Sequence, residues 1–157
     1  PLNTVKTYGA DGGRHGITKD GIERWWRHVI GGAATARFHR QDSGLGLSEL
    51  SMASVKAARQ IELLTKFWEL QPGNSLLSAR EENEAYLTSK PGQAYVLFFT
   101  NGGEVSLDLS EFNSEFSLEW IEIRTGKTQN GNLVKGGENL KLKAPGKLEW
   151  VAILVSK

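Results

Sequence analysis

Residues 93–110 read QAYVLFFTNGGEVSLDLS, and this stretch decides how the C-terminal half of the chain is interpreted. Its second part alternates strictly, with Val105, Leu107 and Leu109 on one face and polar residues on the other. A period of two predicts a β-strand with one buried face. The apolar run before it predicts a second strand, and the Asn-Gly-Gly between them at residues 101–103 favours positive φ and predicts a hairpin turn.

The same period continues towards the end of the chain. Further strands are predicted in FSLEW, LKLK and LEWVAILV, residues 116–120, 140–143 and 148–155. After FSLEW the alternation of apolar residues shifts by one position, to Ile121 and Ile123, which indicates a bulge. Residues 124–132 (RTGKTQNGN) read as a turn-rich connection. Roughly six or seven short strands joined by tight turns predict an antiparallel β-sandwich over residues 85–157.

The first half of the chain has helical periods. Residues 18–30 (TKDGIERWWRHVI) place Ile22 and Trp26 on one face, and either Thr18 or Asp20 can cap the helix before the Gly-Gly pair that ends it. The adjacent Trp25 and Trp26 cannot share a face, so we expect one in the core and the other against a neighbouring element.

Residues 1–9 read as the end of a buried strand that runs into a polar loop. Residues 33–39 (AATARFH) read as a short buried strand, and residues 48–70 as a long helix capped by Ser48 or Ser51. The order is therefore strand, helix, strand, helix, which is a βαβα unit of a larger parallel sheet.

We accordingly expect an α+β fold in two parts. Residues 1–71 match the last βα units of a (β/α)8 barrel, residues 72–84 form a linker, and residues 85–157 form an antiparallel β-sandwich. In a (β/α)8 barrel the active site lies at the carboxyl ends of the strands, in the βα loops.

Composition limits the classes of partner. The 157 residues contain 19 Lys and Arg against 18 Asp and Glu, no Cys, and 39% apolar residues, as in a soluble globular protein. The net charge of +1 and the lack of a basic run argue against a nucleic-acid partner. No apolar stretch approaches the ~18 residues of a membrane span, so we expect no membrane partner.

Candidate site residues stand in the two loops that would follow the strands. The first loop offers Tyr8, Asp11, Arg14 and His15, and the second offers Arg37, His39 and Arg40. These side chains can hold a sugar by hydrogen bonds and an aromatic face. The alternative is that both loops are simply rich in caps and ion pairs.

Metal and cofactor sites have little support in the sequence. His15 and His39 could share a pocket, but they have no fixed helical spacing. The GKT at residues 126–128 lacks the first glycine of a phosphate-binding loop, because Ile121 stands at that position. We expect no metal and no cofactor.

Five stretches carry a family resemblance. They are PLNTVKTYG (1–9), ERWWRHVIGGAA (23–34), QAYVLFFTNGGEVSLDLS (93–110), LEWIEIRTGK (118–127) and APGKLEWVAIL (144–154). In this order they resemble the C-terminal part of the apiosidase-like glycoside hydrolases, whose terminal module is catalogued as a collagen-binding domain.

The resemblance implies a carbohydrate-acting parent protein, outside the cell or in the periplasm. It places the usual glutamate nucleophile near Val5 or Lys6, neither of which is a carboxylate, and the acid/base partner on a barrel strand that this chain lacks. Ordinary glycoside hydrolysis needs two carboxylates. We therefore expect Lys6 to contact substrate and the chain alone to be inactive, its missing barrel strands being supplied by the rest of a longer protein or by another polypeptide.

A second hypothesis is a non-catalytic module that binds carbohydrate or collagen. An exposed aromatic strip on the β-sandwich would favour sugar binding, whereas a smooth polar face would favour packing on the barrel.

Overall fold

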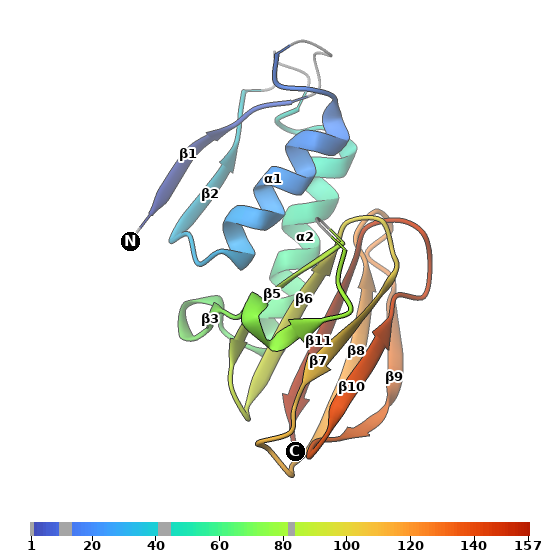
Figure 1. Ribbon diagram of the computed structural model, residues 1–157. Helices are drawn as coiled ribbons and strands as arrows, with labels where there is room; N and C mark the ends of the chain where they lie inside the picture. The colour runs from blue at the N-terminus through green and yellow to red at the C-terminus, as the bar shows by residue number, and fades with distance from the viewer. Residues whose placement is uncertain (1, 10–13, 41–44, 82–83) are drawn as a thin grey trace.

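The computed structural model describes residues 2–9, 14–40, 45–81 and 84–157, and it confirms a mixed α+β fold (Figure 1). The N-terminal elements are β1 (Asn3–Thr7), α1 (Thr18–Ile30), β2 (Thr35–Phe38) and α2 (Glu49–Leu64). The remaining strands are β3 (Gln71–Pro72), β4 (Leu77–Ser78), β5 (Ala85–Lys90), β6 (Ala94–Phe99), β7 (Glu104–Asp108), β8 (Glu115–Glu122), β9 (Thr128–Lys135), β10 (Asn139–Lys143) and β11 (Trp150–Ser156).

The elements form layers. β1 and β2 pair in parallel on one side of α1 and α2, and a six-stranded sheet of order β3-β5-β6-β11-β8-β9 lies on the other side (Figure 1). A three-stranded sheet, β10-β7-β4, covers the far face of the six-stranded sheet. All pairings in these two sheets are antiparallel.

The central strands of the six-stranded sheet are buried on both faces, which corrects the bulge expected after Trp120. Trp120 faces the three-stranded sheet, whereas Ile121 and Ile123 belong to the core beneath the helices. The pairing of β8 with β11 runs without a shift from Phe116 to Glu122. The change of apolar phase therefore marks a strand covered on two sides, and the same cause makes β6 apolar at every position.

The Asn-Gly-Gly turn does not form the expected hairpin. Gly102 and Gly103 do adopt positive φ, of 71° and 93°. However, β6 pairs with β5 and β11, and β7 pairs with β10 and β4, so the turn carries the chain from one sheet to the other. Both edges of β6 are occupied, and β7 must therefore find its partners elsewhere. The expected connection over residues 124–132 is also shorter, because β9 begins at Thr128.

Helix α1 has the predicted bounds, and its two adjacent tryptophans contact different elements, as expected. Trp26 is fully buried and stacks on Phe98 of β6, with ring centroids 5.4 Å apart. Trp25 stacks on Phe38 of β2 at 5.1 Å, so the helix contacts a sheet on each side. The Asp20 carboxylate accepts the Ile17 N–H at 2.8 Å and caps the helix.

Helix α2 is shorter than expected and ends at Leu64, where Thr65 becomes extended. The Ser48 hydroxyl caps it by accepting the Ser51 N–H at 3.3 Å. Its buried positions are mostly small residues, namely Ser51, Ser54, Ala57 and Ile61. Of the large apolar residues in the stretch expected as this helix, residues 48–70, Ile61 is buried, whereas Val55 is 40% and Trp68, beyond α2, is 72% exposed.

Residues 72–84, expected as a linker, contribute strands to both sheets. Pro72 of β3 pairs with β5 in the six-stranded sheet, and β4 pairs with β7 in the three-stranded sheet. The Asn74 side chain accepts the Leu87 N–H at 2.7 Å, which fixes this segment against β5.

Candidate functional site

The carboxyl ends of β1 and β2 lie side by side and position the candidate site. Thr4 pairs with Ala36, and Thr7 pairs with Phe38. Between these pairs β1 has two residues, whereas β2 has one. The extra residue is a bulge at Val5 and Lys6, and bulges are common where a strand must re-aim a side chain. Beyond the bulge, the His39 N–H donates to the Thr7 carbonyl at 2.9 Å.

The two faces of this small sheet differ. Ala36 and Phe38 pack on the core beneath the helices, and the Trp25 indole N–H donates to the Ala36 carbonyl at 2.9 Å. Successive side chains of a strand point to opposite faces. Arg37 therefore lies on the face away from the helices, and neither that face nor the outer edges of β1 and β2 are covered by another strand of the described residues.

Three aromatic rings from separate segments meet at the strand ends. The Tyr8 ring stacks on the His15 ring with centroids 4.6 Å apart and an interplanar angle of 24°. It also contacts the His39 ring at 4.4 Å and 31°. Tyr8 follows β1, and His39 follows β2, so the parallel pairing brings the rings together. We call this cluster of Tyr8, His15 and His39 the ring cluster.

Arg24 of α1 fastens the ring cluster to the helix. Its Nη1 donates to the Tyr8 carbonyl at 2.9 Å and to the His15 carbonyl at 2.6 Å. The sequence analysis did not identify Arg24, because nothing in an amphipathic helix pattern indicates that an arginine will donate hydrogen bonds to the backbone of a loop. Burial first, and then the charges of Arg27 and Arg24, lower the pKa of His28 on the same helix.

The remaining predicted residues surround the ring cluster or lie outside the described part. Lys6, Arg14, Arg37 and Arg40 are exposed to solvent. Asp11 lies in residues 10–13, outside the described residues. The structure thus brings Tyr8, His15 and His39 into contact. Arg14 and Arg40 are adjacent to His15 and His39 in the sequence, Lys6 lies in the bulge, and Arg37 lies opposite it in β2.

Two polar atoms at the strand ends are buried without a hydrogen-bond partner in the described structure, the Thr7 hydroxyl and the His39 Nδ1. The described residues include no group of three His, Asp or Glu side chains that could hold a metal ion. Hydrogen bonds, ring contacts and cationic charge are therefore the chemistry that these strand ends offer to a ligand. No helix of the described residues is long and apolar enough to cross a membrane.

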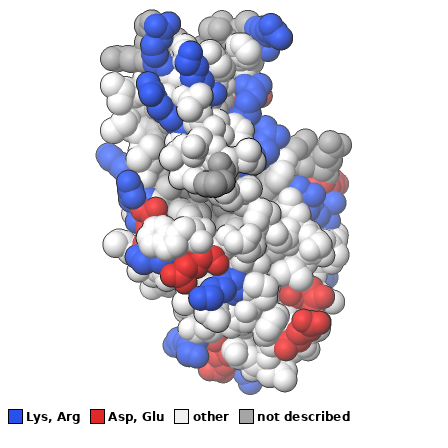
Figure 2. All heavy atoms as spheres, turned by 90° about the vertical axis from the view of Figure 1, so that its left-hand side faces the viewer, with Lys and Arg blue, Asp and Glu red and all other residues white. Residues whose placement is uncertain are grey.

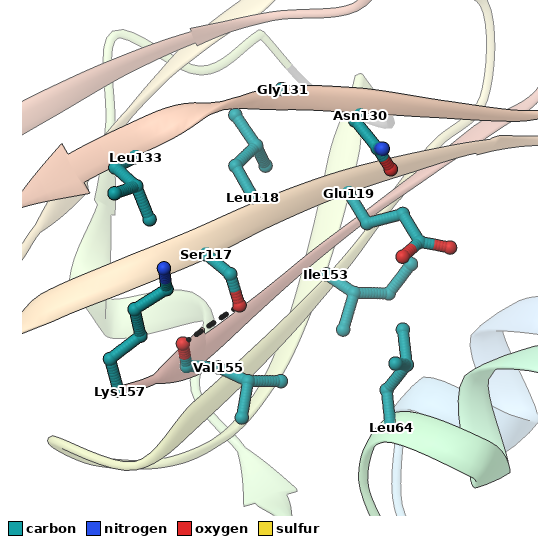
Figure 3. Close-up of a pocket in the computed structure, with 10 residues that line it drawn as sticks. All are labelled: Leu64, Ser117, Leu118, Glu119, Asn130, Gly131, Leu133, Ile153, Val155 and Lys157. Atoms are coloured by element: carbon teal, nitrogen blue, oxygen red, sulfur yellow. Dashed lines mark hydrogen bonds between the residues drawn. The ribbon is translucent and has the colours of Figure 1, made fainter.

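Grooves also lie elsewhere on the surface. One, of about 340 Å³, runs between the end of α2 and strands β8, β9 and β11, with Leu64, Glu119 and Lys157 on its walls (Figure 3). The Ser117 hydroxyl donates to the Val155 carbonyl across its floor at 3.1 Å (Figure 3). None of its lining residues is aromatic. A wider groove of about 730 Å³ separates α1, α2 and β2 near Trp68.

Comparison with solved structures gives the class of protein that has this fold. A structure described as a glycoside hydrolase matches with a TM-score of 0.70 and 15% identity, over 88% of this chain and 36% of its own. A glycoside hydrolase of family 5 from Bacteroides vulgatus ATCC 8482 matches with a TM-score of 0.70 and 17% identity, over the same shares.

A family 44 xyloglucanase from Paenibacillus polymyxa matches with a TM-score of 0.55 and 9% identity, over 98% of this chain and 32% of its own. The chain therefore has a glycoside-hydrolase-like fold and spans about a third of the length of these proteins. No protein-family model and no curated protein sequence matches it.

Proposed function

We propose that this chain is the C-terminal part of a carbohydrate-active protein and binds a saccharide at the carboxyl ends of β1 and β2. The observation that carries the proposal is the ring cluster. Tyr8 and His39 each follow a parallel strand, and their ring centroids lie 4.4 Å apart. Strand ends are where (β/α)8 barrels place their sites, and aromatic faces are a usual surface for sugar rings.

The barrel interpretation is supported by what the N-terminal part leaves uncovered. β1 and β2 have no further strand partners among the described residues, and Leu2 and Val5 of this region are 77% and 65% exposed. Met52 and Val55 of α2 are also 42% and 40% exposed. Open edges and apolar surface of this kind call for neighbouring elements. We propose that further βα units, from the same or another polypeptide, cover them.

We further propose that the two antiparallel sheets form a β-sandwich whose role is to pack on the barrel. The helix side of the six-stranded sheet already belongs to one core with α1 and α2. Most large aromatic residues of the sheets are buried, namely Tyr95, Phe98, Phe99, Phe116 and Trp120. Tyr86 and Trp150 are half-buried. The described strands therefore offer no exposed aromatic strip, which weighs against a separate sugar-binding module.

The finer family assignment rests on the sequence resemblance alone. On that basis we propose an apiosidase-like parent protein, outside the cell or in the periplasm, with the terminal module of the type catalogued as collagen-binding. The bulge at Val5 and Lys6 lies where the resemblance implies a nucleophile. A lysine there cannot form a glycosyl ester, so we propose that Lys6 contacts a ligand and that this chain alone binds without hydrolysing.

Replacing Tyr8 by Ala is expected to weaken saccharide binding about tenfold or more, because the central ring of the cluster is lost. The measurement is an NMR titration of the full chain with three hexasaccharides, from cellulose, alginate and carrageenan. At least one should bind and shift the backbone amides of His15 and His39. Tyr8→Phe should retain binding because it keeps the ring.

Trp68→Ala is the matched control, since Trp68 is an exposed aromatic, 72% open, on another surface. It should leave binding unchanged. The proposal is wrong if none of the three saccharides binds, or if binding depends on Trp68 and not on Tyr8. Thermal unfolding of each variant separates a loss of binding from a loss of fold.

A further inference from the structure

We propose that the saccharide bound at the ring cluster is anionic and carries carboxylate or sulfate groups. This inference rests on the proposed function, and it adds the substrate class. It comes from the charges around the ring cluster.

Four cationic side chains lie at or next to the residues that build the ring cluster. Arg14 precedes His15, and Arg40 follows His39. Arg37 lies between Ala36 and Phe38 in β2, opposite the bulge that holds Lys6. All four are exposed. Each of the segments that supplies a ring therefore also supplies a positive charge.

Three of these cations lack an anionic partner within the described structure. Lys6, Arg14 and Arg37 make no ion pair with any described carboxylate. Asp11 and Asp42, which belong to the two loops, lie outside the described residues, and the four cations outnumber them. The surface around the ring cluster thus carries an excess of positive charge.

Residues 1–40 hold seven Lys and Arg against three Asp and Glu, whereas residues 41–157 hold 12 against 15. Some cations of the second group form ion pairs. Lys90 pairs with Glu69 at 3.1 Å, and Arg124 pairs with Glu149 at 2.9 Å. The whole chain has a net charge of only +1. The excess at the strand ends is therefore local. Figure 2 shows Lys and Arg gathered towards the upper end of the face that carries β1, while most Asp and Glu of this view lie lower.

Rings and guanidinium groups together fit an acidic sugar. An arginine donates two parallel hydrogen bonds to a carboxylate or a sulfate, and such bonds to charged acceptors are stronger than neutral ones. The ring cluster supplies an aromatic face for the sugar ring. A neutral glycan would leave three described cations without counter-charge, whereas an acidic glycan would pair with them.

The test compares acidic and neutral ligands on the full chain. Isothermal titration is done with alginate hexasaccharide (carboxylate), carrageenan hexasaccharide (sulfate) and cellohexaose (neutral), each at low and at moderate salt. We expect one acidic ligand to bind at least about tenfold more tightly than cellohexaose, with the preference shrinking as salt rises. Which of the two acidic ligands binds more tightly identifies the anionic group.

Variants locate the charges. Arg37→Ala should reduce acidic-glycan affinity about tenfold while changing cellohexaose affinity less than about twofold. Lys141→Ala, which removes an exposed cation on β10, should change neither. A single-stranded DNA oligonucleotide serves as a polyanion without sugar-ring selectivity and should bind more weakly than the acidic saccharide.

The outcomes separate this inference from the proposed function. Binding of cellohexaose as tight as, or tighter than, the acidic ligands would overturn the inference and leave the saccharide site standing. Binding of DNA as tight as the acidic saccharide, or equal effects of Arg37→Ala and Lys141→Ala, would overturn it in favour of a general polyanion surface. Binding of no saccharide would overturn both.

Discussion

Replacing Trp26 by Ala is expected to lower the free energy of unfolding by about 3–5 kcal/mol, the largest effect of any substitution considered for this chain. The side chain is fully buried in the core between the helices and the six-stranded sheet. Its ring stacks on Phe98 at 5.4 Å, and its indole N–H donates to the Ser54 hydroxyl of α2 at 3.3 Å. One residue therefore ties α1, α2 and β6 together.

Urea denaturation followed by circular dichroism measures this change. Trp68→Ala is the matched control, because Trp68 is 72% exposed and its ring contacts the Lys66 ammonium at 5.7 Å. That variant should lose no more than about 1 kcal/mol. If Trp26→Ala cost as little as Trp68→Ala, the helices and the six-stranded sheet would not share the core described above.

Replacing Arg124 by Met is expected to lower the free energy of unfolding by about 2–4 kcal/mol, because the Glu149 carboxylate would remain buried without its partner. The guanidinium holds Glu149 through Nε at 2.9 Å and Nη2 at 3.3 Å, and the Glu149 side chain is only 2% exposed. The hydrogen bond to Glu149 raises the pKa of Arg124 above its ordinary value, so the guanidinium is charged at neutral pH.

The double variant Arg124→Met/Glu149→Gln should recover much of this loss, since it removes the buried charge together with its partner. Arg59→Ala provides the surface control. The Arg59 side chain is 75% exposed in its pair with Glu62, and its loss should cost no more than about 1 kcal/mol. Equal destabilisation by Arg124→Met and Arg59→Ala in urea denaturation would show that burial of Glu149 does not matter.

The β part of the fold was largely predictable because its signal is local. The alternation around Val105 and Leu107 predicted the strand β7. The glycines at 102 and 103 predicted the positive φ of the turn. Pairing is not local. The sequence alone did not show that β6 and β7 belong to different sheets, or that the phase change at Ile121 reflects a second covered face.

The helices show the same limit. The bounds of α1 follow from its period and from the Gly-Gly pair after it. The apolar residues of α2 misled the prediction, because the helix buries small residues such as Ser54 and Ala57 while Val55 stays 40% exposed. A close helix contact requires small side chains, and a search for large apolar residues overlooks that face.

At the candidate site the sequence identified the two loops but not their internal contacts. Tyr8, His15 and His39 come together because β1 and β2 pair in parallel, which places their carboxyl ends at one edge. Arg24 holds the cluster by donating hydrogen bonds to the backbone carbonyls of Tyr8 and His15. Every residue has a backbone carbonyl, so a sequence pattern cannot predict which ones accept a hydrogen bond.

The mass of the chain alone under native conditions tests most directly the claim that β1 and β2 belong to a sheet completed by other βα units. We expect a species heavier than the 17.3 kDa of one chain, because open strand edges and exposed apolar residues such as Leu2 and Val5 favour association. A single species of 17.3 kDa that unfolds in one cooperative step would contradict it, since the two strands would then be stable without further cover.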